Sequence, residues 1–191
     1  MMVTIGIIAR VYINDMQCDH AVFTDDTNPM IIRPTTQEDW RDLKAIRLAA
    51  LRDAPTAFGV SYDAAAQYTD EQWQARAAGS DRARYLLALA DSQAGAEAIG
   101  IVAGVVNDDE YHLIAMWVHP AHRGGGIAAR LVAALKERAL AQGHRRIVLD
   151  VAPDNTAAAN LYRRQGFVFL PEWEALESHP QISVQKMAWV A

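Results

Sequence analysis

Hydrophobic residues recur at helical spacing in two segments of the N-terminal half. Between Thr36 and Leu51 the positions that share one helix face are Trp40, Leu43, Ile46, Arg47 and Ala50. This spacing predicts a helix that begins near Thr36. A second helical stretch covers Asp70–Ala78 and carries Trp73. The loop between them, residues 53–59, is rich in helix-breaking residues and holds one aromatic side chain, Phe58, that looks exposed.

Runs of apolar and β-branched residues predict strands over residues 30–34, 85–90, 99–106, 111–118, 146–151, 167–170 and 182–190. Two more helices fall between them. One runs from Ile127 to Gln142 and stops at Gly143, and the other runs from Thr156 to Gln165 and stops at Gly166. Helices first, then a meander of three strands, then a strand–helix–strand unit predict an α/β domain with a mixed sheet.

Composition narrows the class of protein. Of the 191 residues, 51% are hydrophobic and 21% are charged, which is typical of a globular protein and excludes a disordered chain. No apolar run approaches the ~18 residues of a membrane span, so we expect no membrane insertion. The net charge of −5 argues against nucleic-acid binding. The single cysteine, Cys18, excludes a disulfide framework, and no His/Asp/Glu trio has the spacing of metal ligands.

The first 29 residues differ from the rest. They join a β-prone segment, Met1–Ile13, to a polar one, and residues 30–34 then read as the first strand of a domain. Either residues 1–29 form an N-terminal extension, or Met30 is the true start and the upstream codons are a mis-assigned leader. We expect an accessory or dispensable segment, followed by one domain over residues 30–191. Met1–Tyr12 lacks the basic start of a secretory signal, so we expect a cytoplasmic protein.

A glycine-rich stretch separates the strand at 111–118 from the long helix. Three successive glycines, Gly124–Gly126, allow a tight turn that brings main-chain N–H groups close to a ligand. The following helix aims its unpaired N–H groups at the same place, and Arg123 adds a positive charge. This pattern suits a phosphate or pyrophosphate, although a simple helix-capping turn is the alternative. A Walker A loop is excluded because Ile127 and Ala128 stand where it needs Lys and Ser/Thr.

A second cluster follows the strand at 146–151. Asn155 stands at the expected start of the next helix, and Tyr162 lies seven residues later. Seven residues are about two helical turns, so both side chains point the same way. A helix cap and a core aromatic residue are the alternative interpretation.

Together, Arg123-x-x-Gly126-x-Ala128 and Asn155-x-x-Ala158-x-x-x-Tyr162-x-x-x-Gly166-Phe167 resemble the two motifs of the GNAT superfamily of acetyl-CoA-dependent N-acetyltransferases. The resemblance runs in element order from Met30 to Val190. It implies a mixed, mostly antiparallel sheet with flanking helices and a splayed central strand pair. The strand at 111–118 would part from the strand at 146–151, and acetyl-CoA would lie in the gap.

The resemblance also implies site residues. Those that would contact acetyl-CoA are Met116, Trp117, Val118, Arg123, Gly124, Gly125, Gly126, Ile127, Ala128 and Asn155. Tyr162 would lie beside the sulfur, where a phenol is a suitable proton donor to the departing thiolate. The base is less well defined: His112 has a suitable ordinary pKa of ~6.5, but the family often has an acid near that position, and Glu110 lies just before it.

We therefore expect direct acetyl transfer from acetyl-CoA to a primary amine of a small molecule, because residues 30–191 contain no cysteine for an acyl-enzyme. The acidic net charge favours a cationic acceptor, such as a polyamine, an aminoglycoside or a peptide amine. The aromatic residues that would line an acceptor pocket or belong to the core are Phe58, Trp73, Tyr85 and Trp117. The alternatives are acetylation of a protein N-terminus or lysine, and a non-catalytic CoA-binding module. A homodimer through the C-terminal strands is left open.

Overall fold

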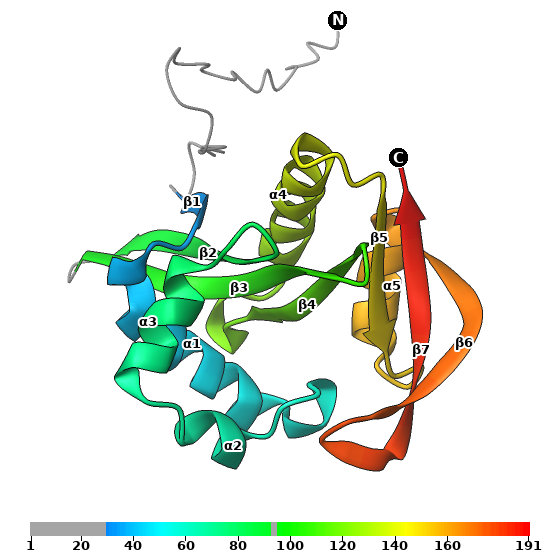
Figure 1. Ribbon diagram of the computed structural model, residues 1–191, viewed down its shortest axis with the longest axis horizontal. Coiled ribbons are helices and arrows are strands. Elements are labelled where there is room, and N and C mark those ends of the chain that lie inside the picture. The colour runs from blue at the N-terminus through cyan, green and yellow to red at the C-terminus, as the bar shows by residue number, and fades with distance from the viewer. Residues whose placement is uncertain (1–29, 93–94) are drawn as a thin grey trace, which may run out of the picture.

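The computed structural model describes residues 30–92 and 95–191 as a seven-stranded sheet with helices on both faces (Figure 1). The prediction for residues 1–29 lies outside the described residues. The strands are β1 (Met30–Pro34), β2 (Ala83–Ser92), β3 (Gly95–Asn107), β4 (Glu110–Val118), β5 (Arg146–Val151), β6 (Val168–Leu176) and β7 (His179–Val190). The helices are α1 (Trp40–Asp53), α2 (Tyr62–Ala66), α3 (Asp70–Ala78), α4 (Ile127–Ala141) and α5 (Thr156–Arg164). No helix in this part of the chain is long and apolar enough to cross a membrane.

The strand order is β1-β2-β3-β4-β5-β7-β6, and every neighbouring pair is antiparallel except β4 and β5. The predicted mixed, mostly antiparallel sheet is therefore confirmed. The parallel pairing between β4 and β5 extends over only two residue pairs, Tyr111 with Ile147 and His112 with Val148. Beyond His112 the two strands separate, as the predicted splayed pair requires.

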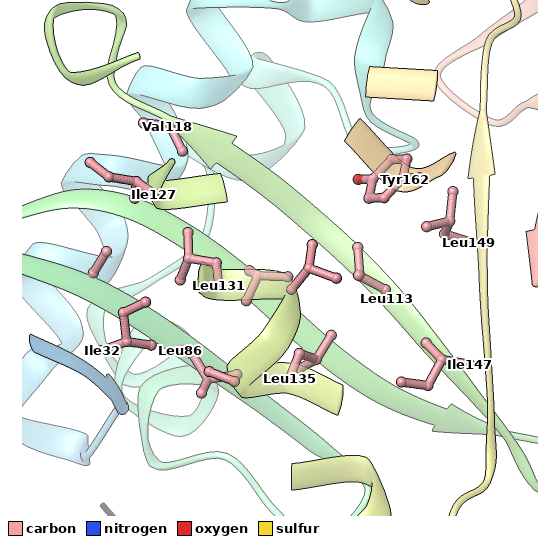
Figure 2. Close-up of a cluster of buried hydrophobic side chains, with 14 of the residues drawn as sticks. Ile32, Leu86, Leu113, Val118, Ile127, Leu131, Leu135, Ile147, Leu149 and Tyr162 are labelled. Atoms are coloured by element: carbon pink, nitrogen blue, oxygen red, sulfur yellow. The ribbon is translucent and has the colours of Figure 1, made fainter. Parts of the chain in front are cut away.

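The two faces of the sheet carry separate hydrophobic cores because side chains alternate along each strand. On one face, Leu86 and Ile147 pack with Leu131 and Leu135 of α4 (Figure 2). On the other face, Leu87 joins a cluster of buried residues from α1, α2 and α3. Figure 1 shows α1–α3 on one side of the sheet and α4 on the other.

A bidentate ion pair ties the start of α1 to β1. The guanidinium of Arg33 donates to both carboxylate oxygens of Asp39, with N–O distances of 2.7 Å. The main-chain N–H of Thr36 also donates to Asp39. These contacts, led by the hydrogen bond from Arg33, lower the pKa of Asp39 to about 2.

The structure differs from the sequence-based expectations in several places. Helix α1 begins at Trp40 and not near Thr36, and β2 and β3 are longer than the predicted strands at 85–90 and 99–106. The short helix α2 lies where no element was predicted. Strands β6 and β7 are longer than the predicted strands at 167–170 and 182–190, because β6 continues through Pro171; it is an edge strand, where proline is tolerated. The prediction that Phe58 is exposed is wrong. The residue is 7% exposed and packs into the core beneath α1.

Candidate active site

Strand β4 is irregular where it borders the gap to β5. Ile101 of β3 pairs with Trp117 and Ala103 pairs with Ile114, so β4 has one residue more than β3 between these pairs. The extra residue forms a bulge, within which Ala115 has φ of +58°. Left-handed backbone is costly for alanine and is concentrated at functional sites. The bulge therefore marks this edge of the gap as a candidate site.

The separation of β4 from β5 opens a cavity of about 800 Å³. Its walls include residues 112–116 of β4, residues 149–151 of β5 and the inner face of α5. Figure 2 shows the two strands diverging from the region of Ile147, with Tyr162 between them. The far end is lined by α1, the loop after it and α3, and by the hairpin of β6 and β7.

Tyr162 reaches this cavity from α5. It is 6% exposed, and its ring packs edge-on against Phe167 with 5.7 Å between ring centroids. No residue in the described part of the chain forms a hydrogen bond with its hydroxyl, which points toward β4 in Figure 2. Burial raises the pKa of Tyr162 well above its ordinary value, so the phenol keeps its proton at neutral pH.

Asn155 caps α5 and also lies at the cavity. It is the N-cap of α5, and its Oδ1 accepts a hydrogen bond of 3.2 Å from the main-chain N–H of Ala158. It also lines the cavity together with Tyr162. Because the cap uses Oδ1, the side-chain NH₂ group is the part that can donate to a ligand.

His112 lies at the last paired position of β4, at the narrow end of the gap, and lines the cavity. Burial lowers its pKa below 6.5, so the imidazole is neutral at pH 7 and can accept a proton. The carboxylates of Asp150 and Glu174 oppose this shift, and both also line the cavity. Glu110 lies outside the cavity, where it pairs with Arg146; its Oε2 is 3.6 Å from Nε2 of His112.

The glycine turn follows β4 and leads directly into α4. Gly124 and Gly126 have φ of +87° and +79°, values that favour glycine. Gly126 is the N-cap of α4 and provides no side-chain cap, so the first N–H groups of the helix are left for another partner. A Cβ added at Gly124 or Gly126 would meet no atom within 4 Å, so a ligand can approach the main chain closely there.

Arg123 is fixed to the elements around the glycine turn. Its Nε donates to the carbonyl oxygen of Val118 at 3.0 Å, and its guanidinium forms a salt bridge with Asp53 of α1. Asp53 also accepts a hydrogen bond of 2.8 Å from the indole of Trp117. The side chain of Arg123 remains half exposed, so its charge can act on an anion at the turn.

The far end of the cavity contains a residue whose role the sequence did not suggest. Phe58, Trp73 and Tyr85 line this end, whereas Trp117 does not. Arg47 of α1 lies among them, only 9% exposed, with its guanidinium carbon 4.4 Å from the centroid of the Phe58 ring. In the sequence, the sign of a special role was the position of Arg47 on the apolar face of the predicted helix.

Residues 30–92 and 95–191 contain no group of three or more His, Cys, Asp or Glu side chains placed to hold a metal ion. The polar groups that face the cavity instead suit proton transfer, since a neutral imidazole and a protonated phenol lie within one enclosure.

Comparison with known proteins agrees with this geometry. The model of the family described as "Acetyltransferase (GNAT) family" matches residues 43–167. An acetyltransferase of the GNAT family from Streptococcus pneumoniae is 24% identical, with a TM-score of 0.69 over 85% of this chain and 99% of that chain. Arabidopsis thaliana NAA60 in complex with acetyl-CoA is 17% identical, with a TM-score of 0.64 over 84% and 98%. RimL, a ribosomal L7/L12 alpha-N-protein acetyltransferase in complex with coenzyme A, is 16% identical, with a TM-score of 0.68 over 88% and 97%.

Proposed function

Since the chain belongs to the acetyltransferase (GNAT) family and is therefore an acyltransferase, we propose that it transfers an acetyl group from acetyl-CoA directly to the primary amine of a small molecule. The observation that carries this proposal is the cavity formed where β4 and β5 separate, because it brings a neutral His112 and a protonated Tyr162 into one enclosure.

The residues present fit acetyl-CoA. Strand β4 leads from the cavity to the glycine turn, where the uncapped start of α4 and the open space around Gly124 and Gly126 suit a diphosphate. Arg123 adds a positive charge beside the turn. Asn155 lines the same cavity, and its NH₂ group suits an amide carbonyl of the pantetheine arm.

His112 would prepare the amine for attack. A primary amine of pKa ~10 is mostly protonated at neutral pH and must lose a proton before its nitrogen can form a bond. His112 is neutral and half-buried at the narrow end of the gap, so it can take that proton. Asp150 and Glu174 lie near enough to stabilise the resulting imidazolium, which makes them positioning residues.

The bulge and Tyr162 would serve the later part of the reaction. As the nitrogen–carbon bond forms, the carbonyl oxygen gains negative charge, and main-chain N–H groups at Ala115 and Met116 can stabilise it, since neither residue is paired in the register with β3. The carbon–sulfur bond then breaks, and Tyr162 gives its proton to the sulfur. The nitrogen loses its second proton as the amide forms, which restores Tyr162, and His112 releases the first proton to solvent.

Two features support a small acceptor over a protein chain. Aromatic side chains, including Phe58 and Tyr85, surround the far end of the cavity. The hairpin of β6 and β7 also contacts the loop after α1, because the hydroxyl of Ser178 donates to the carbonyl oxygen of Phe58. This contact joins two segments that line the cavity, whereas an extended peptide needs an open groove. The cytoplasmic location and the homodimer stay predictions.

The first test is a calorimetric titration of the purified chain with acetyl-CoA. We expect binding by the wild type and a loss of at least about tenfold in affinity for the double variant Arg123→Ala, Gly126→Asp, because a charge-assisted contact is lost and a carboxylate is placed at the turn. Arg164→Ala, which removes an exposed arginine at the end of α5, is the matched control and should bind normally.

Release of CoA on addition of amines then tests the transfer itself. Absence of acetyl-CoA binding by a folded wild-type chain would overturn the assignment of the cavity and the glycine turn. Binding without CoA release for every class of amine would identify a non-catalytic CoA-binding module in place of an enzyme.

A further inference from the structure

Arg47 is a buried cation that lines the cavity. It is 9% exposed, and its Nη1 is buried with no hydrogen-bond partner among the residues that the structure describes. Within residues 30–92 and 95–191, no carboxylate forms a salt bridge with it. A guanidinium stays charged in proteins, so its burial without an anion is costly. The cavity that it lines offers the place for a partner from outside the chain.

Trp73, which also lines the cavity, has a second buried donor without an acceptor among the described residues. Trp73 of α3 is 1% exposed, and no residue in the described part of the chain accepts from its Nε1. Buried polar groups are almost always hydrogen-bonded, so the unsatisfied donors of Arg47 and Trp73 set this end of the cavity apart from an ordinary core. Phe58 covers Arg47 at 4.4 Å, which holds the guanidinium against the wall.

The basic and acidic side chains that line the cavity come from different segments of the chain. Residues 47–85 contribute two basic side chains to its lining, Arg47 and Arg76, and no acidic one. Arg76 is already engaged, since it stacks on Tyr68 at 3.9 Å and donates to the carbonyl oxygen of Gln72 at 3.2 Å. The carboxylates that line the cavity all lie after β4 in the sequence: Asp150, Asp154, Glu174 and Glu177.

From these observations we propose that Arg47 binds a carboxylate of the acceptor, so that the substrate is an amine that also carries a carboxylate group, as a free amino acid does. The inference rests on the proposed acetyltransferase function and specifies its acceptor. The planar guanidinium matches a carboxylate with two parallel hydrogen bonds. The ammonium group then lies toward His112. This acceptor replaces the purely cationic one expected from the net charge.

The experiment compares matched acceptors with the full chain and acetyl-CoA. Each L-amino acid is paired with its carboxamide, which keeps the amine and the side chain but removes the negative charge, and spermidine represents purely cationic amines. CoA release gives kcat and KM for each compound. We expect kcat/KM for the preferred amino acid to exceed that of its carboxamide by roughly 10- to 100-fold, as for a hydrogen-bonded charge pair.

Variants at position 47 locate the source of this preference. Arg47→Met should abolish the difference between the two members of the preferred pair, mainly through KM of the amino acid. Arg47→Lys keeps the charge but loses the planar fork, so part of the preference should remain. Arg41→Met removes an exposed arginine from the same helix and should leave the preference intact. Arg47→Met should unfold at the same temperature as the wild type or higher, because an unpaired buried charge is removed.

Equal kcat/KM values for amino acids and carboxamides, or an undiminished preference in Arg47→Met, would overturn this inference and leave the acetyltransferase function in place. Turnover of spermidine alone would do the same. Failure of every amine to release CoA from a chain that binds acetyl-CoA would instead overturn the proposed function, and the acceptor inference would fall with it.

Discussion

Replacement of Tyr162 by phenylalanine removes one oxygen atom from the cavity and leaves the ring in place. The hydroxyl has no hydrogen-bond partner in the described part of the chain, and the ring keeps its edge-on contact with Phe167. The free energy of unfolding should therefore change by no more than about 1 kcal/mol. The affinity for acetyl-CoA should also be nearly unchanged, because the hydroxyl is expected to act on the sulfur only as the carbon–sulfur bond breaks.

The rate should fall much further than the stability. A positioned proton donor contributes roughly 10²- to 10⁴-fold, which corresponds to about 2.7 to 5.4 kcal/mol of activation free energy. Since burial raises the pKa of Tyr162 well above its ordinary value, the wild-type phenol remains a proton donor throughout the neutral and mildly alkaline range. Loss of kcat in Tyr162→Phe should therefore be similar across that range.

The assay is steady-state CoA release with calorimetric affinity for acetyl-CoA and a thermal melt for each variant. Tyr111→Phe is the matched control, because Tyr111 is 2% exposed and lies outside the cavity. An unchanged kcat in Tyr162→Phe would show that Tyr162 serves only the packing of α5. A fall in kcat accompanied by an equal fall in stability or acetyl-CoA affinity would refute the proton-donor role in the same way.

Three further predictions concern the base and two structural contacts. In the wild type, kcat should be constant at neutral pH and fall only below about pH 6.5, because burial lowers the pKa of His112 and a base acts when it is deprotonated. His112→Ala should remove this fall in kcat at acidic pH. An unchanged acidic limb would assign the base to Glu110 or to water. Gly104→Ala should lower the free energy of unfolding in urea by about 1 to 3 kcal/mol, since its Cβ would lie 2.1 Å from the hydroxyl oxygen of Tyr111; an unchanged midpoint would contradict that contact. Asp39→Asn should lower the free energy of unfolding by roughly 1 kcal/mol near neutral pH, after solvent screening of the ion pair. This difference from the wild type should vanish as the pH falls from about 4 through about 2, because the lowered pKa of Asp39 is reached there. A pH-independent difference would mean that the charge of Asp39 contributes nothing.

Periodicity identified the elements whose apolar pattern is regular. Strand β5 has the predicted bounds, Arg146–Val151, and α3 has the predicted bounds, Asp70–Ala78. For α3 the local signal is complete, because Thr69 and Gln72 form a capping box. The extent of β6 was not predictable in this way, since Pro171 breaks a strand pattern unless the strand lies at the edge of a sheet.

Part of the candidate site could likewise be predicted from the sequence, and part could not. Motif spacing identified the glycine turn and the α5 residues, whose roles depend on neighbours in the sequence. The environment of Arg47 depends on contacts between segments far apart: α1, Trp73 of α3 and the loop at Phe58 meet only in the folded chain. Its position on an apolar helix face was visible in the sequence, but the absence of a partner anion became visible only in the structure.

The short junction between β4 and β5 also has a mechanical meaning. Pairings of five to ten residue pairs connect the strands on either side of it, whereas two pairs connect the four-stranded part to the three-stranded part. The distance between β4 and β5 is therefore among the most easily changed dimensions of the sheet. A molecule that contacts both β4 and β5 holds the two strands together. Its binding should therefore slow amide exchange at Tyr111 and Val148, although the molecule contacts neither residue.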